Sequence, residues 1–425
     1  PSGEKALGVY HNYTSLTSAL SEYAAAYPNI VRLYSLGQSV QGRELWAMLI
    51  TDNPDAEEDE PEFKYVSTIH GDEPVGTELC LYLINYLLVK YATDTRISNL
   101  VDSTEIWIVP LMNPDGREKV WRYNANSIDL NRNFPVFPGE FTGTHYSGAP
   151  LNETNRQIET QHVMRWTARH NFVLSANIHT GELAVNYPYD DDGKPSGTDS
   201  PSPDDLMFEN VCRRYSVHNT DLWNSPEFTN GITNGAVWYV IKGGMQDWNY
   251  RYAGCNEVTI ELSVTKWPAE STLALYWANN TESMLAYMEA VHIGVRGLVT
   301  DGRTGEPLWA EVRVVNNAQP VATDPDVGDY HRMLLPGTYD LTFASEGYFT
   351  KTVEDVVVLN DTPVRVDVGL LDGDIDGDGV IGASDIQLIV NAILGYPGDF
   401  PTDLDGGGTT STDLQLIVNT VLSRR

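Results

Sequence analysis

The chain has 425 residues, of which 41% are hydrophobic, and its 59 Asp and Glu against 27 Lys and Arg give a formal net charge of -32 at pH 7. This composition excludes a disordered or fibrous protein, and the length exceeds what one hydrophobic core supports, so two or three domains are expected. So negative a surface would repel nucleic acid and anionic membranes. It favours calcium or cationic substrates, unless the acidity serves only solubility.

The cysteines and the apolar runs narrow the class further. Cys80, Cys212 and Cys255 are too few for a disulfide scaffold and too scattered for a thiolate metal site. Cys80 lies in an apolar run and is expected to be a buried thiol, whereas pairing of Cys212 with Cys255 stays open. No apolar run approaches the roughly 18 residues that cross a bilayer. Because Pro1 follows no signal peptide, we expect a processed or trimmed chain.

From Tyr10 to about His292, apolar runs alternate with helical patterns. Strands are predicted at 63–70, 105–113, 172–179 and 257–262, and a helix at 76–91. The strand runs lack polar alternation, so both of their faces are expected to be covered. Residues 1–292 are therefore predicted to form an α/β domain, a mixed and mostly parallel sheet with helices on both faces.

The pattern changes at about Gly294. Short alternating runs at 295–301, 310–316, 338–344 and 363–371 are separated by Gly, Pro and Asn turns without a helical period. This pattern predicts an all-β sandwich of roughly seven or eight strands over residues 293–371.

An internal repeat occupies residues 372–425, where SDIQLIVNAIL at 384–394 is followed by TDLQLIVNTVL at 412–422. Such a duplication predicts a small all-α module. Ahead of the first copy, oxygen donors stand at positions 1, 3, 5, 7 and 12 of an EF-hand-like loop, namely Asp374, Asp376, Asp378, the carbonyl of Val380, and Asp385. Carboxylates spaced around a glycine turn suit a hard cation such as Ca2+. A solvated acidic tail is the alternative.

The second loop departs from this pattern. Asp403, Asp405 and Asp413 span one residue fewer than the first loop, and glycine replaces the acidic ligand at position 5. Its affinity for calcium is therefore open, and one or two Ca2+ ions are expected.

Candidate metal ligands stand at the ends of predicted strands. His70 closes the strand at 63–70, and Glu73 follows it in a strand-to-helix turn. His179 ends the strand at 172–179, and Glu261 ends the strand at 257–262. Such strand ends gather along one edge of an open α/β sheet. Two His and one carboxylate would leave a zinc position open for water, with Glu261 free to transfer protons.

A series of segments carries a family resemblance. In chain order they are HGDEPVG, PLMNPDG, WRYNANSIDLNRNFP, SANIHTGELAVNYPYD, GAVWYVIKGGMQDWNY and EVTIELS. Over about residues 8–290 they resemble the zinc metallocarboxypeptidases, specifically the subfamily of carboxypeptidases D, E, M and N. The resemblance implies one catalytic Zn2+ on His70, Glu73 and His179. It also implies Glu261 as general base and acid in a secreted enzyme that removes C-terminal residues from peptides and proteins.

The resemblance also assigns residues to the substrate. Arg122 matches the arginine that polarises the scissile carbonyl. Asn131 and Arg132 match the pair that grips the terminal carboxylate, and Tyr239 matches the mobile tyrosine that closes on it. Independently, a planar guanidinium is well suited to bidentate binding of a carboxylate. The alternative is that Asn131 and Arg132 cap a turn and that Tyr239 is a packing residue.

Asp190, followed by two further aspartates, stands eleven residues after His179. In the resembled subfamily an aspartate of this stretch faces a C-terminal Lys or Arg, and Gln246 takes a pocket position. A buried carboxylate opposite a cation discriminates strongly, because an apolar residue would leave the charge unpaired. The alternatives are a solvated loop or a second calcium site. The segment GCNE stands where the subfamily has NCFE, so the shape of the substrate pocket near Cys255 stays open.

The trailing regions also resemble known modules. Residues 293–371 resemble the transthyretin-like domain of the same subfamily, which implies structural support or a folding aid, with carbohydrate binding as the alternative. Residues 372–425 resemble a dockerin, whose implied partner is a cohesin module of an extracellular scaffold. Two other functions remain: an inactive peptidase fold acting as an adaptor, and a zinc amidase for cell-wall or side-chain amides. Retention of Glu261 and all three zinc ligands argues against the adaptor.

Overall fold

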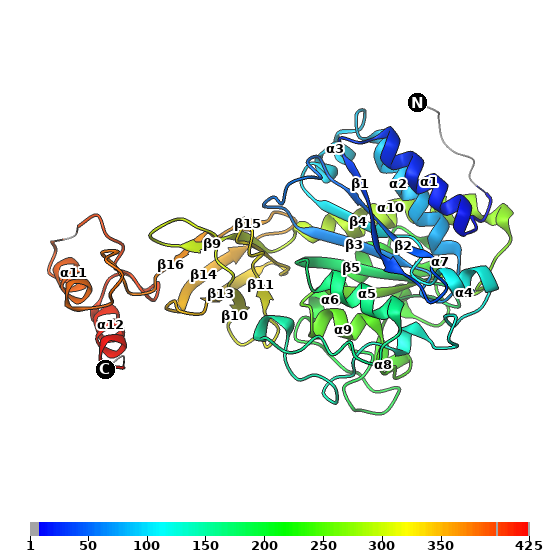
Figure 1. The fold of residues 1–425 in the computed structure, drawn as a ribbon. Coiled ribbons are helices and arrows are strands. Elements are labelled where there is room, and N and C mark those ends of the chain that lie inside the picture. The colour runs from blue at the N-terminus through cyan, green and yellow to red at the C-terminus, as the bar shows by residue number, and fades with distance from the viewer. Residues whose placement is uncertain (1–7, 397, 424–425) are drawn as a thin grey trace. The chain divides into compact units, whose positions relative to one another are not determined.

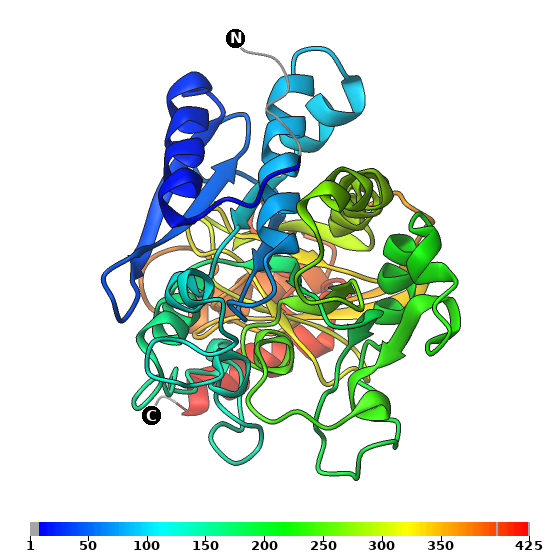
Figure 2. The same cartoon turned by 90° about the vertical axis from the view of Figure 1, so that its right-hand side faces the viewer.

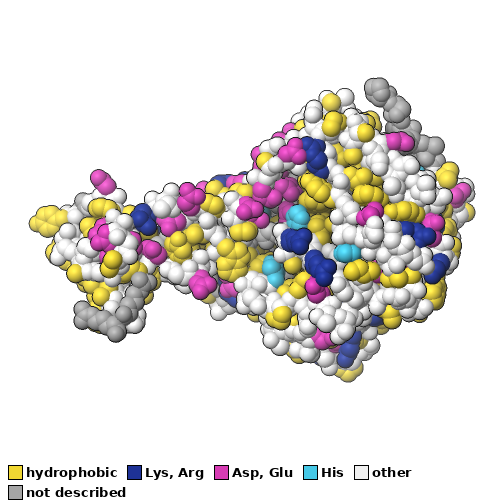
Figure 3. Space-filling view, in the orientation of Figure 1, with side chains coloured by type: hydrophobic (Ala, Val, Ile, Leu, Met, Phe, Trp, Pro, Cys, Tyr) yellow, Lys and Arg dark blue, Asp and Glu magenta, His cyan; other side chains and the backbone are white. Residues whose placement is uncertain are grey.

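The computed structural model describes residues 8–396 and 398–423. They fall into two compact units, the first comprising residues 8–56 and 60–291 and the second comprising 57–59 with the described residues from 292 onward. Acidic side chains occur over both units on the face drawn in Figure 3. The net negative charge is therefore not confined to one of the units.

The first unit is built on one mixed sheet. Its strands are β1 Val31–Gln38, β2 Glu44–Ile50, β3 Glu62–Ser67, β4 Glu105–Val109, β5 Phe172–His179, β6 Leu183–Tyr187, β7 Ile232–Asn234 and β8 Asn256–Leu262. Among the described residues they form an eight-stranded sheet in the order β1-β2-β4-β3-β5-β8-β6-β7 (Figure 1). The central strands β4, β3, β5 and β8 run parallel and are buried along their length. Burial on both faces explains their unbroken apolar runs.

Ten α-helices accompany this sheet in the described part of the first unit. They are α1 Tyr13–Ala26, α2 Val75–Lys90, α3 Thr95–Val101, α4 Pro114–Lys119, α5 Ile158–Thr167, α6 Asp205–Ser216, α7 Thr220–Trp223, α8 Gly235–Trp238, α9 Met245–Arg251 and α10 Leu273–Glu289. Figure 2, turned by 90°, shows α1 in dark blue and α2 in light blue rising on the same side of this unit. No helix in the described part of the chain combines the length and apolar character that crossing a membrane requires.

Helices cover both faces of the sheet. On one face, the Tyr65 hydroxyl of β3 donates to the carbonyl of Met284 in α10 at 2.9 Å. On the opposite face Val66, the next residue of β3, belongs to an apolar cluster with Trp166 of α5 and Trp248 of α9. Consecutive strand residues point to opposite faces, so β3 contributes to both layers. This arrangement agrees with the α/β fold expected from the sequence.

The strand that leads to His70 is shorter than predicted. The apolar run predicts a strand as far as His70, but β3 ends at Ser67 because Thr68, with φ of 54°, leaves the extended conformation. The Thr68 hydroxyl lies 2.8 Å from that of Thr77 and donates to the carbonyl of Glu73 at 3.2 Å. These bonds tie the turn to the start of α2. His70 therefore lies in the turn, beyond the end of the strand.

In the second unit, residues 295–370, all of them described, form two small sheets. The strands are β9 Val295–Asp301, β10 Glu311–Val314, β11 Val321–Ala322, β12 Asp329–Arg332, β13 Gly337–Ala344, β14 Lys351–Val358, β15 Val364–Arg365 and β16 Val368–Leu370. One sheet has the order β11-β10-β13-β14 and the other β12-β9-β15, with β16 also pairing with β9. Val299 of β9 and Phe343 of β13 share one buried cluster, so a single apolar core joins the two sheets.

Two helices follow, α11 Ala383–Ile393 and α12 Ser411–Ser423. Each begins after an acidic loop and carries an aspartate in its first turn, Asp385 or Asp413. Ile389 and Ile417, at equivalent places of the repeat, are both fully buried in one small apolar cluster. The sequence repeat is thus a structural repeat whose two copies pack on each other.

All three cysteines lie in the described part of the chain and are free. Cys80, Cys212 and Cys255 are each fully buried. Burial raises the pKa of the Cys255 thiol to about 12. Cys255 packs in the apolar cluster with Trp248, so the thiols behave as small hydrophobic side chains.

Candidate active site

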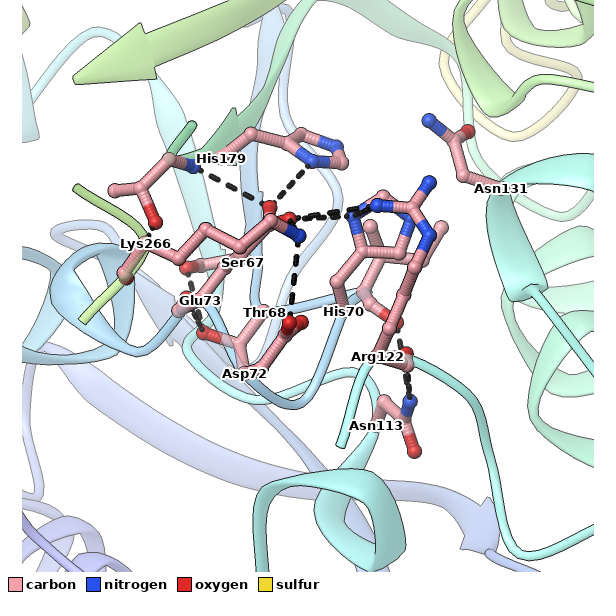
Figure 4. Close-up of polar contacts among 12 residues, drawn as sticks. Ser67, Thr68, His70, Asp72, Glu73, Asn113, Arg122, Asn131, His179 and Lys266 are labelled. Carbon is pink, nitrogen blue, oxygen red and sulfur yellow. Dashed lines mark hydrogen bonds and ion pairs between the residues drawn. The ribbon is translucent and has the colours of Figure 1, made fainter. Parts of the chain in front are cut away.

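Three potential metal ligands converge near the carboxyl ends of β3 and β5. One ligand atom each from His70, Glu73 and His179 lies within 4.8 Å of the others, and all three residues are buried. Glu73 joins the two imidazoles: its Oε1 is 3.1 Å from Nδ1 of His70 and its Oε2 is 3.0 Å from Nδ1 of His179 (Figure 4). Two imidazoles and a carboxylate are a donor set of catalytic zinc sites. The residues therefore fit a zinc ion.

The charges of these three side chains depend on one another. Burial lowers the pKa of His179 to about 4, so this imidazole is neutral at pH 7. Burial would raise the pKa of Glu73, but His70 and a hydrogen bond with His179 outweigh it and lower that pKa well below its usual range. Burial would lower the pKa of His70, but Glu73 and Asp129 outweigh it and raise that pKa. A metal binds a deprotonated imidazole nitrogen, so metal binding here would compete with protonation of His70.

Glu261 lies beside the three ligands on β8. The parallel register of β5 and β8 places it directly opposite His179. Its side chain is buried, and its Oε2 has no hydrogen-bond partner in the part of the chain that the structure describes. Burial, and then the charge of Glu73, raise the pKa of Glu261 well above its usual range. A buried carboxylate with a raised pKa and an unoccupied acceptor oxygen is suited to proton transfer.

Asp129 links this cluster to Arg122. No pattern in the sequence predicts a role for Asp129. Its Oδ1 is 3.1 Å from Nε2 of His70, and its Oδ2 accepts a hydrogen bond from Nε of Arg122 at 2.9 Å. A carboxylate on the second nitrogen of a ligand histidine fixes the orientation of the ring. Asp129 stands in the segment that carries Asn131, but it lies 59 residues from His70, so no local spacing connects the two.

Lys266 is a second residue of the site that the sequence motifs do not predict. Its Nζ is 2.7 Å from Oε1 of Glu73 and 3.3 Å from Oδ2 of Asp72 (Figure 4). The hydroxyl of Thr180, which follows β5, donates to the Lys266 carbonyl at 2.7 Å. This contact brings the lysine to the end of β5, where it offsets part of the negative charge. A lone lysine five residues after Glu261 carries no motif that would have indicated this position.

The residues expected to hold a substrate carboxylate adjoin one another. Asn131 Oδ1 accepts the backbone N–H of Met245 at 2.9 Å, which leaves the amide Nδ2 as the end that can donate to a ligand. Arg132 donates to the Asn131 carbonyl at 2.7 Å and forms a hydrogen bond with Tyr239. Tyr239 is 38% exposed. The capping alternative holds in part, because Asn131 caps the first residue of α9.

Asp190 and Gln246 are both buried and are hydrogen-bonded to each other. Nε2 of Gln246 donates to Oδ1 of Asp190 at 3.2 Å and to Oδ1 of Asn186 at 3.0 Å. The solvated-loop alternative does not describe Asp190, which is only 3% exposed. Burial, and then the charge of Asp247, raise the pKa of Asp190 well above its usual range. Among the described residues, Oε1 of Gln246 has no partner. This buried pair therefore offers acceptor oxygens that a cation could satisfy.

The first acidic loop gathers its carboxylates. One oxygen each of Asp374, Asp376 and Asp378 lies within 4.8 Å of the others. The N–H of Val380 donates to Asp378 at 2.8 Å, and the Val380 carbonyl is the candidate seventh-position ligand. Gly379 has φ of 88°, a conformation that glycine adopts without strain. The loop therefore has the turn that its spacing predicted.

Both acidic loops are closed by the aspartate in the first turn of the following helix. Asp385 accepts the N–H of Ile375 at 2.7 Å, and Asp413 accepts the N–H of Leu404 at 2.6 Å. In the second loop, the remaining candidates bond within the loop: Asp403 accepts the N–H of Gly406, and Asp405 accepts that of Gly407. The two loops thus share one closing contact despite their different lengths.

Comparison with known proteins places this geometry in a family. A family model described as zinc carboxypeptidase matches residues 16–283, more than half of the chain. The chain therefore belongs to the zinc carboxypeptidase family. Carboxypeptidase M of Mus musculus is 40% identical over 367 residues, which cover 80% of this chain and 80% of that relative.

Two further comparisons extend this result. Carboxypeptidase D of Mus musculus is 43% identical over 389 residues, which cover 87% of this chain and 27% of the relative. The chain thus spans about a quarter of the length of that relative. The crystal structure of carboxypeptidase A from Helicoverpa armigera matches with a TM-score of 0.54 at 20% identity, covering 67% of this chain and 75% of that one. At this identity the likeness shows the fold alone.

Proposed function

We propose that this chain is a zinc-dependent exopeptidase that hydrolyses the C-terminal peptide bond of peptides and proteins and prefers a terminal Lys or Arg. The observation that carries this proposal is the convergence of His70, Glu73 and His179, with Glu261 in register opposite His179. Membership of the zinc carboxypeptidase family supports both the metal and the reaction.

His70, Glu73 and His179 would hold the zinc ion. When bound, zinc supplies a Lewis acid that polarises the scissile carbonyl and lowers the pKa of water. Glu261 accepts the proton of the attacking water at its buried Oε2, which has no hydrogen-bond partner among the described residues. As the C–N bond breaks, Glu261 returns that proton to the leaving amine. The hydroxyl stays on the carbonyl carbon, and the products are an amino acid and a shortened peptide.

Arg122 stabilises the negative charge that develops on the carbonyl oxygen. Its guanidinium lies 3.5 Å from Oε1 of Glu73 and is held by Asp129 at 2.8 Å, so it is positioned before substrate arrives. A preorganised donor of this kind is typically worth about 3 kcal/mol in the transition state. Asn131, Arg132 and Tyr239 would bind the terminal carboxylate, which restricts the enzyme to chain ends. The roles of Asn131, Arg132 and Tyr239 are inferred from the resemblance to the family.

The preference for basic termini is assigned to Asp190 and Gln246. A terminal ammonium or guanidinium would pair with the Asp190 carboxylate and donate to the unpartnered Oε1 of Gln246. An apolar terminal residue would bury these groups without partners, which costs binding free energy.

For the β region we propose domain limits of 293–371 and a transthyretin-like character, after a catalytic domain of residues 1–292. The match with carboxypeptidase D supports a further domain of the same family. It covers 87% of the chain, and therefore extends beyond the 292 residues of the catalytic domain. A role in structural support is consistent with its single apolar core.

For residues 372–425 we propose a calcium-binding, dockerin-like module that attaches a secreted enzyme to a cohesin of an extracellular scaffold. The structural repeat of α11 and α12 and the gathering of Asp374, Asp376 and Asp378 support this proposal. Calcium at the first loop would be held by these carboxylates, the Val380 carbonyl and Asp385, and a second ion by Asp403, Asp405 and Asp413.

Mass spectrometry of peptides incubated with the zinc-loaded protein tests the enzyme. Peptides that differ only in a C-terminal Arg, Lys, Phe or Glu should lose one terminal residue, fastest for Arg and Lys. A chelator should stop the reaction and added zinc should restore it. Cleavage of side-chain or cell-wall amides alone would indicate an amidase. A zinc-replete protein without any turnover would indicate an adaptor.

A further inference from the structure

We propose that Asp247, in α9, is a positioning residue that sets the geometry of the Asp190 pocket and thereby the preference for basic termini. This inference rests on the proposed function of that pocket. Asp247 acts through the backbone that carries Asp190 and makes no contact with the substrate itself.

The contact consists of one carboxylate bound by two consecutive amides. Oδ1 of Asp247 accepts the N–H of Asp190 at 2.9 Å, and Oδ2 accepts the N–H of Asp191 at 3.0 Å. These two N–H groups belong to the peptide units on either side of the Asp190 Cα, so the bonds fix both of those peptide planes. They therefore fix the direction in which the Asp190 side chain leaves the backbone. Hydrogen bonds to an ionised acceptor are stronger than neutral ones.

The same helix holds the neighbouring parts of this segment. Gln246 donates to the carboxylate of Asp190 at 3.2 Å. Arg251 donates to the carbonyl of Asp191 at 2.8 Å, and its guanidinium lies 3.6 Å from the ring centroid of Tyr189. Three side chains of α9 therefore contact residues 189–191. Asp247 and Arg251 bind backbone groups, Gln246 binds a carboxylate, and Arg251 also lies over an aromatic ring.

The carboxylate of Asp190 has little room to move. A Cβ at Gly235 would lie 2.0 Å from Oδ1 of Asp190, and a Cβ at Gly244 would lie 3.3 Å from its Oδ2. Because Oδ1 of Asp190 occupies the space that a Cβ at Gly235 would fill, a shift toward Gly235 would bring the carboxylate against the backbone of α8. Binding geometry of this kind tolerates errors of only about 0.5 Å.

Hydrogen bonds hold α9 to the strands of the sheet beneath it. Lys64, fully buried, donates to Oδ1 of Asn249 at 3.1 Å, and Asn249 Nδ2 donates to Oε2 of Glu257 at 2.6 Å. Lys64 belongs to β3 and Glu257 to β8, so the helix is tied to the parallel centre of the sheet. If the bonds of Asp247 are lost, we therefore expect the 189–191 segment to shift rather than α9.

Asp247→Asn tests the proposal with the smallest change. Asparagine has one acceptor oxygen and one NH2 donor, so one of the two backbone amides would face another donor. The control is Asp192→Asn, which removes the same charge from the adjoining loop, where the Asp192 carboxylate pairs with Lys194 and also bonds Ser200. The assay compares kcat and KM for two peptides that end in Arg or Ala, on variants with measured zinc content.

The expected result is specific to basic substrates. In Asp247→Asn the KM for the Arg peptide should rise about tenfold or more. The kcat for this peptide, the zinc content, and both kcat and KM for the Ala peptide should change little. Asp192→Asn should keep the wild-type ratio. An unchanged Arg to Ala ratio in Asp247→Asn would overturn the inference, as would an equal loss of kcat on both peptides.

Two further outcomes are informative. If the wild type shows no preference for Arg over Ala, the proposed pocket fails together with this inference, whatever the variants do. If Asp247→Asn does not fold, Asp247→Ser, which keeps one small acceptor, replaces it. Failure of both variants to fold beside a soluble Asp192→Asn would make Asp247 a general structural residue and overturn the positioning role.

Discussion

His179 and Glu261 stand directly opposite each other on the parallel strands β5 and β8. Residues paired in register point to the same face of the sheet, and a slip of one residue would move Glu261 to the other face. The relation between the imidazole proposed to bind zinc and the carboxylate proposed to move protons is therefore set by the backbone hydrogen bonds at the centre of the sheet. It does not depend on a flexible loop.

Glu261→Gln should abolish proton transfer while leaving the metal in place. Glutamine keeps the size of the side chain but cannot accept the proton, so kcat should fall by roughly 10²–10⁴-fold. Because the three candidate ligands are untouched, zinc content by atomic absorption should equal that of the wild type. A variant that keeps wild-type kcat would remove Glu261 from the mechanism.

Asp129→Asn should weaken zinc binding. The carboxylate that orients His70 through its Nε2 would become a neutral amide, and loss of such a partner typically lowers metal affinity about 10–100-fold. Competition with a chelator measures the affinity. Asp102→Asn is the control, since the Asp102 carboxylate bonds the hydroxyl of Tyr91 on the surface. Equal zinc affinities of both variants would contradict the orienting role.

Asp190→Asn should remove most of the preference for basic termini. The variant pocket keeps its size but loses the charge that pairs with a terminal cation, so kcat/KM for an Arg peptide should fall by roughly 10²-fold relative to an Ala peptide. Steady-state kinetics on the two peptides measure the ratio. If the ratio persists, another group must bind the cation.

Glu257→Gln should change how stability depends on pH. Burial raises the pKa of Glu257 from 4.5 to about 7. A carboxyl that binds its proton more tightly in the folded state contributes stability that declines as pH rises from about 4.5 to about 7. The free energy of unfolding of the variant minus that of the wild type should therefore be roughly 2–3 kcal/mol larger at pH 8 than at pH 5.

Denaturant titrations at the two pH values measure this difference. The amide oxygen of the variant can keep the hydrogen bonds from Ser175 and Asn249, so packing should persist. A difference of the opposite sign would show that Glu257 is ionised in the fold at low pH.

Calcium should bind the first acidic loop more tightly than the second. The first loop has Asp378 at the position where the second has Gly407, and fewer charged ligands lower the affinity. Isothermal titration of the chelator-treated full chain should show one tight event that Asp376→Ala removes and Asp405→Ala preserves. Two events of equal affinity, or none, would contradict the assignment.

Much of this protein could be predicted from its sequence, because the relevant signals are local. Unbroken apolar runs mark strands buried on both faces, so the α/β fold follows from the composition of each run. The motif segments follow one another in a family order, and the family match over residues 16–283 agrees with them. The residue types at positions such as His70, Glu73 and His179 already define a donor set for zinc.

Contacts between residues far apart in the chain became apparent only from the folded structure. Thr68 ends β3 early, which places His70 in a turn where Asp129 reaches its Nε2. Lys266 meets Glu73 across 193 residues, and Asp247 meets the amides of Asp190 and Asp191 across 57 and 56 residues. No local pattern encodes such pairs, because they depend on strand register and on the path of each turn. The sequence supplied the chemical groups, and the packing of the sheet decided which of them touch.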